Sequence, residues 1–516
     1  MRKFSETGLK MGKILGIDLG TTNSCIAIIE GNEPVVVVNS EGQRTTPSMV
    51  AFTAKGECHV GVHAKRQATV NPERTIFGVK RLIGRRANEE SIKELAESLP
   101  YHITASDTGD AWVQIDDKRY SPEEISSMIV AKLKECAETY CSDDITQCVV
   151  AVPAYFTDAQ RQATREACRL AGLEVLRIMN EPTLAALAYG VKKRGSGYIA
   201  VFDLGGGTFD ISILQCNEGT FKVLATAGNN RLGGGDFDTL IYEFLANKFK
   251  EETGVDISND KMAIQRVRET AESLKCELST LSETTVNLPF LAIGPAGPLH
   301  LAEMVTREEI EELVKPLIDK LDAPCHDALH QAGLSADDLD EVLLVGGMSR
   351  MPAVKARVEA IFGPKISHGV NPDEAVALGA AVQSGILGGD IEEVVLLDVT
   401  PLNLGIETAG NRVSTIIERN ASIPTQASKV FTTTENNQSF VRITVTQGDS
   451  DKASECTRLG AFIISDIPPM PAGKPRIEVQ FSIDADGVVS VQGVERQTGV
   501  VKSLIIQDAV GLNYKK

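Results

Sequence analysis

The 516-residue sequence contains no long hydrophobic run. Its apolar stretches, such as Val394 to Leu397, are far shorter than the roughly 20 residues that a membrane-spanning helix needs. The first ten residues also lack the apolar core of a secretory signal peptide, so no such signal is expected. Met11 is a second possible start, and we therefore expect residues 1–11 to be an extension outside the fold.

Paired cysteines are missing as well. The ten cysteines are scattered along the chain, mostly among apolar neighbours, and no two of them form a C-x-x-C motif. This spacing argues against a metal cluster or a disulfide framework and favours reduced cysteines in the core. We therefore expect a reducing compartment, namely the cytoplasm.

Basic residues are also fewer than acidic ones: the chain has 52 Lys and Arg against 70 Asp and Glu, which gives a formal net charge of −18. An acidic chain is a poor partner for nucleic acid or for an anionic membrane surface, so neither partner is expected. The apolar content of 42% and the charged content of 24% are ordinary for globular proteins. The chain is too long for a single hydrophobic core, which predicts several domains.

Two common nucleotide-binding motifs are absent. The chain has neither G-x-x-x-x-G-K-[ST] nor G-x-G-x-x-G, which excludes a P-loop and a Rossmann site. Instead, the pattern from Tyr198 to Leu214 predicts a strand, a Gly-rich turn and a second strand. Asp203 and Asp210 lie on either side of Gly205 to Gly207 and Thr208. We expect these glycines to adopt positive φ and their N–H groups to form an anion-binding nest. Carboxylates beside such a nest suit Mg²⁺ bound together with a phosphate.

The same pattern occurs a second time. Residues 13–29 can be aligned with this stretch, so that Asp18 corresponds to Asp203 and Gly20 to Gly205. The two copies are about 185 positions apart in the chain. A lone Gly-rich turn is usually only a turn, whereas two matching copies predict a duplicated unit with two hairpins facing one ligand. Glycines, threonines and carboxylates in these turns favour a nucleotide phosphate as that ligand.

The rest of the chain divides into two parts. Helices alternate with strands up to about residue 390, including a long helix expected from Thr306 to about Gln331. From Val399 to Ile506 no clear helical period remains, which predicts a separate all-β domain. The run Val394 to Leu397 between the two parts is typical of a linker that docks. The strands expected in the β domain are Asn403–Glu407, Val413–Glu418, Lys429–Thr434, Phe440–Thr446, Ile477–Ile483, Val488–Val494 and Leu504–Ile506.

Lys80 lies in a basic stretch and allows two interpretations. It either belongs to a solvated basic face or turns inward, where a lysine would position water and a γ-phosphate. Glu272, Lys275 and Ser279 likewise share one helical face that is either a solvated stripe or part of a site. Glu181 follows a strand end, where α/β sheets place ligand-binding groups.

A third Gly-rich turn, Gly346 to Arg350, lies between a strand and a helix, which again suits phosphate. The sequence as a whole resembles the 70-kilodalton heat-shock (DnaK-type) chaperone family. The resemblance rests on motifs in the following places: Gly16–Cys25, Val79–Arg86, Val152–Phe156, Asn180–Thr183, Asp203–Asp210, Val345–Gly347, Asn371–Val376 and Leu396–Leu402.

The resemblance implies an α/β actin-like (ribonuclease H-like) ATPase domain of two lobes, joined by an apolar linker to an all-β sandwich that binds extended peptides. It implies an ATP-dependent molecular chaperone and ATP hydrolase, in which peptide affinity is coupled to hydrolysis. The implied cofactors are ATP or ADP, Mg²⁺ and K⁺. The implied partners are unfolded polypeptides, a J-domain co-chaperone and a nucleotide-exchange factor of the GrpE type. The expected divisions are 1–11 (extension), 12–390 (ATPase domain, with lobes of about 12–197 and 198–390), 391–398 (linker), 399–509 (β sandwich) and 510–516 (tail).

The resemblance also assigns residues to these functions. The catalytic residues are Lys80, Glu181, Asp203, Thr208 and Asp18, and the cation site comprises Asp18, Asp203 and Asp210, largely through water. The nucleotide-binding residues are Gly20, Thr21, Thr22, Asn23, Gly205, Gly206, Gly207, Glu272, Lys275, Ser279, Gly346, Gly347, Arg350 and Asp373. The peptide-binding residues are Ile406, Ala409, Phe431, Thr434, Val441 and Ile443. The allosteric residues are Pro153, Arg161, Arg177, Asn180, Val395, Leu396, Leu397 and Asp398.

Three features depart from the family pattern. Gly235 stands where the family usually has an acidic residue, which is expected to alter contacts between the lobes. Ala409 and Thr434 are small where the family arches larger side chains over the peptide, and we expect no helical lid after the β domain. Two alternatives stay open: another actin-fold ATPase, such as a sugar kinase or filament protein with an accessory β domain, or a lidless regulatory member of the family.

Overall fold

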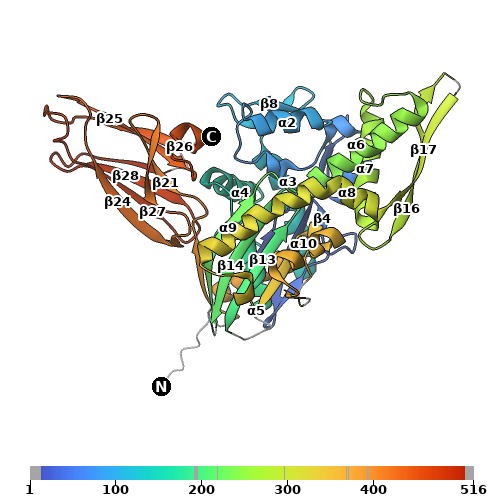
Figure 1. Ribbon diagram of the computed structural model, residues 1–516, viewed down its shortest axis with the longest axis horizontal. Helices are drawn as coiled ribbons and strands as arrows, with labels where there is room; N and C mark the ends of the chain where they lie inside the picture. The colour runs from blue at the N-terminus through green and yellow to red at the C-terminus, as the bar shows by residue number, and fades with distance from the viewer. Residues whose placement is uncertain are drawn as a thin grey trace.

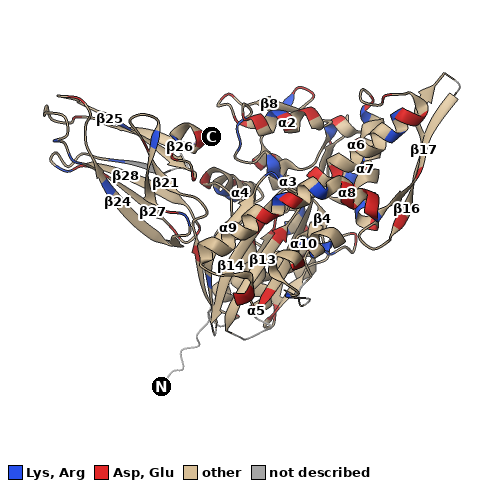
Figure 2. Cartoon of the chain, viewed as in Figure 1, with Lys and Arg blue, Asp and Glu red and all other residues tan. Residues whose placement is uncertain are grey.

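The computed structural model describes residues 13–190, 196–217, 219–295, 297–367, 369, 371–391 and 394–505. The expected extension at residues 1–11 and the expected tail at 510–516 lie outside the described residues. Figure 1 shows a large mixed α/β part and, beside it, an all-β part in orange and red. Figure 2 shows acidic side chains on many elements, including α8 (Arg307–Ile318), in keeping with the negative net charge. Within the described ranges, none of the helices has the length and apolarity needed to cross a bilayer.

The first copy of the predicted unit forms one mixed sheet. Its strand order is β12-β11-β1-β2-β3, with β4 (Thr46–Pro47) also paired to β2. Strand β1 runs parallel to β11 and antiparallel to β2, as a hairpin followed by a crossover requires. The bounds are β1 Ile14–Asp18, β2 Asn23–Glu30, β3 Glu33–Val36, β11 Gln147–Val152 and β12 Glu174–Asn180.

The second copy forms a sheet with the same internal order. Its strands run β19-β18-β13-β14-β15 and then continue into β20 and β23. Strand β13 is parallel to β18 and antiparallel to β14, as β1 is to β11 and β2. The predicted duplication is therefore present in the topology. The bounds are β13 Gly197–Leu204, β14 Phe209–Asn217, β15 Thr220–Asn229, β18 Glu341–Val345, β19 Ile366–Ser367, β20 Val395–Val399 and β23 Ser422–Ile423.

Two helices, α5 (Glu181–Gly190) and α11 (Ala375–Gly388), bring the two sheets together. They share one buried apolar cluster with residues of both sheets. A Cβ on Gly379 of α11 would lie 1.9 Å from the Leu184 carbonyl oxygen of α5. A Cβ on Gly16 of β1 would lie 2.4 Å from the Ala381 backbone nitrogen of α11. Small residues at these points let the elements approach closely, which sets the distance between the two sheets.

Each copy carries its own insertions. In the first they include α1 (Val62–Gln67), the 3₁₀ turn η2 (Val79–Arg81), α2 (Glu90–Ser98), α3 (Pro122–Cys141) and α4 (Asp158–Leu170). In the second they include α6 (Gly234–Thr253), α7 (Lys261–Glu277) and the hairpin β16 (Glu283–Gly294) to β17 (Gly297–Thr306). Smaller elements are β5 Val50–Phe52, β6 Cys58–Val60, η1 Pro72–Arg74, β7 Thr75–Ile76, β8 His102–Ala105, β9 Ala111–Ile115, β10 Lys118–Tyr120, η4 Ala336–Asp338, η5 Gly347–Arg350 and α10 Pro352–Phe362.

The single long helix predicted from Thr306 is wrong. The structure has α8, then a 3₁₀ turn, η3 (Asp319–Leu321), then α9 (Asp322–Ala332). Pro324 has no N–H to donate to the carbonyl four residues earlier, so the α-helical ladder is interrupted at this point. The predicted N-terminus is correct, because Thr306 caps the helix by accepting from the Glu309 backbone N–H.

The all-β part consists of two four-stranded sheets, β22-β21-β25-β26 and β24-β27-β28-β29, around an apolar cluster of its own. The prediction missed β26 (Thr457–Ile464), where Gly460, Ala461 and Phe462 break the polar–apolar alternation. It also placed β24 too late, because the edge strand Thr425–Phe431 begins with polar residues. The other bounds are β21 Leu404–Thr408, β22 Arg412–Ile417, β25 Val441–Gln447, η6 Ala453–Glu455, β27 Ile477–Ile483, β28 Val489–Glu495 and β29 Val501–Ile505.

The apolar run predicted to dock does so as a strand. Strand β20 pairs in parallel with β15, Leu396 opposite Phe221, and antiparallel with β23, Asp398 opposite Ile423. Leu396 also packs against the cluster between the two large sheets. One short strand therefore connects the sheet of the second copy to the all-β part.

Candidate functional site

A cavity of about 380 Å³ opens where the turns of β1–β2 and β13–β14 face each other. Gly207 and Asp210 are the two predicted residues of this site that do not line it. Gly207 lies in the second turn next to Thr21, and Asp210 lies in β14 opposite Asp203. The predicted residues that line it are Asp18, Gly20, Thr21, Thr22, Asn23, Lys80, Glu181, Asp203, Gly205, Gly206, Thr208, Glu272, Lys275, Ser279, Gly346, Gly347, Arg350 and Asp373. Residues from seven separate stretches of sequence thus meet at one place.

The glycines of the second turn are needed for space and not for their backbone angles. The sequence predicts positive φ for Gly205 to Gly207, and this is wrong, because none of the three has it. A Cβ on Gly206 would instead lie 2.1 Å from the Thr22 hydroxyl oxygen in the opposite turn. In the third Gly-rich turn, Gly346 does have positive φ, at 77°. The glycines of the second turn therefore let the two hairpin tips touch.

Lys80 faces inward. It lies in η2, and its ammonium is 2.7 Å from a carboxylate oxygen of Glu181, with both side chains only 9% exposed. Burial disfavours the charged lysine, but Glu181 and Asp18 outweigh burial and raise the pKa of Lys80. The side chain is therefore a buried cation, and the interpretation as a solvated basic face is wrong.

Three further carboxylates surround this pair. Burial, together with the charge of Glu181, raises the pKa of Asp18 to about 7 and that of Asp210 to about 8, and raises that of Asp203 well above its ordinary value. Oδ1 of Asp210 is buried and has no hydrogen-bond partner among the described residues. Carboxylates that outnumber cations in this way make a donor set that suits a hard cation such as Mg²⁺.

Direct chelation by the protein alone does not fit. Among the described residues, no three His, Cys, Asp or Glu side chains are grouped closely enough to hold a metal ion. A cation in this cluster would therefore complete its shell with water or phosphate oxygens, as Mg²⁺ does at phosphate sites.

Charged pairs also line the cavity. The Lys275 ammonium lies 2.6 Å from Asp238, and the Arg350 guanidinium lies 2.6 Å from Asp373. Glu272 pairs with Lys65 of α1 at 3.0 Å, which joins the two lobes across the cleft. The Lys275 side chain is only 10% exposed, so the interpretation as a solvated stripe does not apply to it.

Several lining residues were not predicted. Asp238, Cys276, Met348 and Met351 also face the cavity. Asp238 meets Lys275 only because α6 packs against α7, and no local motif in the sequence marks that contact. Ser279, although predicted on the helical face, lies just after the last residue of α7 and donates to the Lys275 carbonyl at 3.0 Å.

The predicted peptide-binding residues lie in the all-β part. Ile406 and Ile443 are buried in its core, and Phe431 and Val441 pack half-buried against the same cluster. Ala409 and Thr434 are exposed beyond the ends of β21 and β24. The structure thus brings four of the six together around one core.

The predicted allosteric residues fall in two adjoining places. Val395, Leu396 and Leu397 pair with β15 at the edge of the second sheet, and the others lie near the end of the first sheet. Arg161 of α4 donates to the Asn180 side-chain oxygen at 2.6 Å, and Thr183 donates to Asp398 of β20 at 2.9 Å. Burial lowers the pKa of Arg161 and raises the pKa of Asp398. Pro153 ends β11 beside them and is buried.

A turn of the β part contacts this region. Asp486, between β27 and β28, accepts from Arg165 at 2.8 Å and from Arg177 at 2.9 Å. In addition, the Val489 backbone N–H donates to Asp158 at 3.0 Å. The sequence Asp486–Gly487 indicates a hairpin turn, but nothing in it reveals that α4 and β12 supply the partners.

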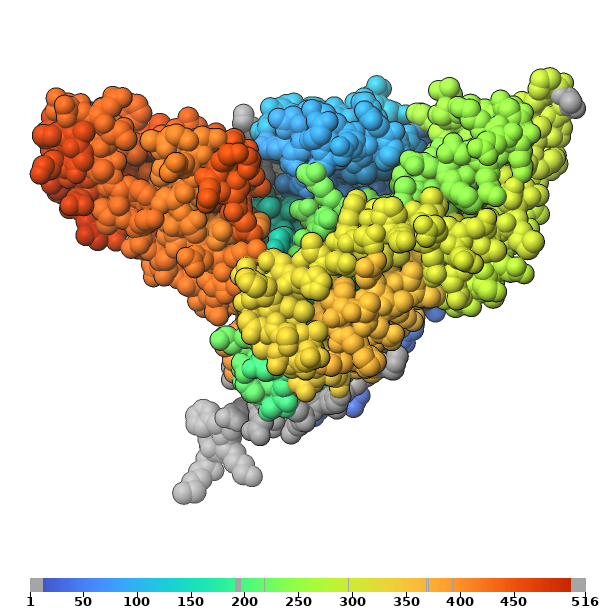
Figure 3. Space-filling view, viewed as in Figure 1, coloured from blue at the N-terminus to red at the C-terminus, as the bar shows by residue number. Residues whose placement is uncertain are grey.

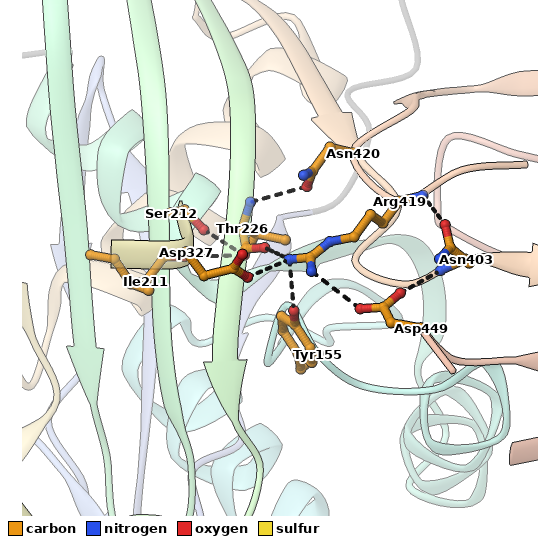
Figure 4. A network of polar contacts seen from close by, with 9 residues as sticks. All are labelled: Tyr155, Ile211, Ser212, Thr226, Asp327, Asn403, Arg419, Asn420 and Asp449. Carbon is orange, nitrogen blue, oxygen red and sulfur yellow. Dashed lines mark hydrogen bonds and ion pairs between the residues drawn. The ribbon is translucent and has the colours of Figure 1, made fainter. Parts of the chain in front are cut away.

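A second contact centres on Arg419, in the loop between β22 and β23 (Figure 4). Its guanidinium lies 3.0 Å from Asp327 of α9, 3.2 Å from Asp449 and 3.2 Å from the Thr226 carbonyl oxygen. The neighbouring Asn420 side chain accepts from the Thr226 backbone N–H at 3.2 Å. Figure 3 shows the orange β part abutting the yellow surface of α9 at this place.

Comparison with known families agrees with this geometry. A family model described as "Hsp70 protein" matches residues 14–516, nearly the whole chain. Members of that family combine an actin-like ATPase, which uses ATP and Mg²⁺, with a β-sandwich, and they act on unfolded proteins together with co-chaperones. The chain therefore belongs to the Hsp70 family of ATP-dependent molecular chaperones.

Proposed function

We propose that this chain hydrolyses ATP in the cavity between the two hairpin turns and couples the reaction to binding of extended apolar peptides by the β part. The proposed divisions are an ATPase domain at 12–390, a linker at 391–398 and a peptide-binding domain at 399–509. The observation that carries the proposal is that both turns and the buried Lys80–Glu181 pair face one cavity, while β20 ties the same sheet to the β part.

Hydrolysis is proposed to proceed by direct attack of water on the γ-phosphate. Lys80, held by Glu181, is the cation that positions the water and the phosphate, and Thr208 contributes a hydroxyl from the second turn. No nucleophile–base pair lines the described cavity, so positioning and electrostatics carry the reaction. Asp18, Asp203 and Asp210 would hold Mg²⁺ largely through water, and K⁺ nearby. The metal neutralises the charge of the phosphates.

The adenosine part of ATP is proposed to lie between Glu272, Lys275 and Ser279 on one side and Arg350 and Asp373 on the other. These residues line the same cavity as Lys80. Because Lys275 and Arg350 are already paired with carboxylates, they are held in position before a nucleotide arrives. Such preorganisation lowers the entropy cost of binding.

Cys276 offers a direct test of this placement. Its side chain is exposed and lines the cavity beside Lys275, whereas the equally exposed Cys58 lies elsewhere on the surface. Alkylation with iodoacetamide at mildly alkaline pH, followed by mass spectrometry, should show that ATP slows modification of Cys276 but not of Cys58. Equal rates at Cys276 with and without ATP would place the nucleotide elsewhere.

The β domain is proposed to hold an extended peptide by backbone hydrogen bonds and by burying one or two apolar side chains near Ile406, Phe431, Val441 and Ile443. Addition of a peptide to a sheet in this way, with pockets for alternate side chains, is a recurring mode of recognition. Ala409 and Thr434 would form only a low arch over the peptide. Peptide release is therefore proposed to be fast.

Coupling is proposed to run through β20 and the two contacts at Asp486 and Arg419. A J-domain co-chaperone acting near Arg177, Asn180 and Asp398, and a GrpE-type exchange factor, are the proposed regulators. Steady-state ATPase activity measured with and without an extended apolar peptide tests the coupling. Asp486→Asn removes both ion pairs of the first contact and should reduce the stimulation by peptide severalfold.

The matched control for that experiment is Asp466→Asn. Asp466 is a carboxylate of the β domain that accepts a hydrogen bond from the adjacent Ser465 and takes no part in the contact with the first lobe. The control should leave stimulation by peptide unchanged. If the Asp486 variant behaves like the control, this contact does not transmit the effect of peptide on ATPase activity. The proposal that the chain hydrolyses ATP would not be affected.

A further inference from the structure

A second cavity, of about 170 Å³, lies directly beside the nucleotide cavity. Thr21, Thr22, Gly206, Asp238 and Glu272 line both, so the touching hairpin tips form part of the wall between them. The remaining walls come from the insertions of the two lobes. A molecule in the second cavity would therefore contact the phosphate turns from behind without occupying the nucleotide position.

One side of this cavity is apolar. Phe77, Leu95, Leu99 and Tyr101 of the first lobe line it. The rings of Phe77 and Tyr101 pack edge to face with their centroids 5.6 Å apart, and the Tyr101 hydroxyl donates to the Phe77 carbonyl at 2.5 Å. The aromatic wall is thus rigid, and its polar atom is already satisfied. Mostly apolar cavities with a few placed polar groups are typical of small-molecule sites.

The other side carries an arginine without a counter-ion. Arg268 of α7 lines the cavity, and its Nε is buried without a hydrogen-bond partner. Within the described part of the chain its guanidinium has no ion pair. It stacks over the Tyr242 ring, 5.0 Å from the centroid, and the more distant charges of Asp238 and Glu243 act against the effect of burial on its pKa. Burial lowers the pKa of Arg268. The Arg268 side chain as a whole is partly buried, but its Nε is shielded from water without a partner, and an anion in the cavity would supply one.

The carboxylates of the same wall do not supply that anion. Asp238 pairs with Lys275, and Glu272 pairs with Lys65. Glu269 accepts hydrogen bonds from Thr69 at 2.8 Å and from Gln265 at 3.1 Å. Each is engaged with another group, which leaves Arg268 as the open cation of the cavity.

Gly235 helps to keep the cavity open. A Cβ at this position of α6 would lie 3.3 Å from a terminal nitrogen of Arg81, which also lines the cavity. An acidic side chain at this position would extend toward Arg81 and into this space. Arg81 itself is paired with Asp236 at 2.9 Å.

We propose that this second cavity binds a small amphipathic carboxylate, with the carboxylate on Arg268 and an aromatic or branched aliphatic body against Phe77, Leu95 and Leu99. Guanidinium groups bind planar carboxylates through two parallel hydrogen bonds, which favours this anion over a spherical one. The proposal does not depend on ATP hydrolysis, because it concerns a neighbouring cavity and is tested by binding alone.

The probe is benzoate, with benzamide as its uncharged isostere. Ligand-detected NMR and calorimetry on the full chain, with ATP at saturation, should show benzoate binding at least tenfold more tightly than benzamide. Saturating ATP should leave benzoate binding within a few fold, since the two cavities are separate. Complete competition by ATP would overturn the proposal by placing benzoate in the nucleotide cavity.

Three variants locate the site. Arg268→Gln should remove the preference for benzoate over benzamide, and Gly235→Glu should weaken both ligands at least tenfold by filling the cavity. Arg266→Gln is the matched control on the same helix, because Arg266 does not line this cavity and bonds the carbonyls of Pro289 and Phe290. Melting curves verify folding. Retention of the benzoate preference in the Arg268 variant, or of wild-type affinity for both ligands in the Gly235 variant, would overturn the proposal.

Discussion

The two large sheets have the same strand order but end differently. The first stops at β3, whereas the second continues past β15 into β20 and β23. Both copies can build half of a phosphate site, because each has a hairpin whose turn faces the other. Only the second copy has an edge on which the linker forms a strand, and it is this edge that connects the site to the β domain.

The two hairpins also differ at one register position. In the first, Asp18 lies opposite Cys25, and in the second, Asp203 lies opposite Asp210. Burial, followed by the charge of Asp18, raises the pKa of Cys25, so this thiol stays neutral where the second hairpin has a carboxylate. The second hairpin therefore has two carboxylates at this register where the first has one, and it offers more oxygen ligands to a cation.

The largest expected effect concerns Lys80, the cation that the insertion of the first copy supplies. Lys80→Ala should lower ATP turnover by roughly 10²–10³, as loss of a preorganised charged group does, while ATP affinity changes little. Single-turnover hydrolysis and equilibrium binding of labelled ATP measure the two quantities. Lys93→Ala, at an exposed lysine paired only with Glu90, is the control. Wild-type turnover in the Lys80 variant would remove Lys80 from the mechanism.

The second prediction breaks the feature that the second sheet has and the first lacks. Changing Leu396 and Leu397 to Asp places charges in β20 and should undock it from β15. ATP should then no longer change peptide affinity, an effect whose usual size is about 1–3 kcal/mol. Fluorescence anisotropy of a labelled peptide with and without ATP measures it. If ATP still lowers peptide affinity in the double variant, β20 does not couple the two sites.

The third prediction compares glycines of the two turns. A Cβ on Gly20 would meet the Asn23 carbonyl oxygen at 2.0 Å, and one on Gly206 would meet the Thr22 hydroxyl at 2.1 Å, but one on Gly205 would have 3.8 Å to its nearest atom. Without nucleotide, Gly20→Ala and Gly206→Ala should each lower the free energy of unfolding by about 1–3 kcal/mol, with Gly20 the worse because a backbone atom must move. Gly205→Ala should change it by less than about 0.5 kcal/mol.

Urea unfolding of the three glycine variants checks this order. Equal losses in all three would show that the turns need backbone freedom after all, as the sequence pattern indicates. A loss only in the Gly205 variant would contradict the contact between the hairpin tips.

The smallest expected effect is the pH dependence of docking between the first lobe and the β domain. It involves Asp158, which lies at their contact. Burial raises the pKa of Asp158 to about 6, opposed by the Val489 N–H and by Arg161 and Arg165, and assisted by Asp484. Because the docked carboxyl holds its proton to a higher pH than a free one, docking takes up a proton. Docking is therefore favoured at low pH, and this contribution is lost as pH rises through about 6.

Between pH 7.5 and 5.5 the docking equilibrium should rise roughly fourfold from this group alone. Small-angle X-ray scattering of the full chain should show a more compact particle at the lower pH. Asp158→Asn should flatten this dependence, and an unchanged pH profile in that variant would assign the effect to another group.

Much of the fold was predictable because its signals are local. The capping pairs Ser121–Glu124 and Thr306–Glu309 are local sequence signals of helix starts, and both form in the structure. The prediction failed where local signals are weak or conflict. Strand β26 lacks clear alternation, and a proline next to a 3₁₀ turn divides the helix that was expected to be continuous.

The candidate site shows the same division. Residues in Gly-rich turns and at strand ends were predicted from pattern and resemblance, and those assigned to the nucleotide all line one cavity or lie in the turns that line it. Asp238, Asp327, Arg419 and Asp486 were missed, since each acquires its partner from an element far away in sequence. Lys80 could not be decided by spacing, because burial depends on what packs around a residue.

The sequence by itself determined the duplicated hairpins, the helix starts and the change from an α/β to an all-β pattern, because turn chemistry and side-chain periodicity act over a few residues. Only the tertiary structure decided that the glycines serve contact between two turns, that Lys80 points inward to Glu181, and that Arg268 lacks a counter-ion. These properties depend on distances between segments far apart in the sequence, and on the low polarity that packing creates around them.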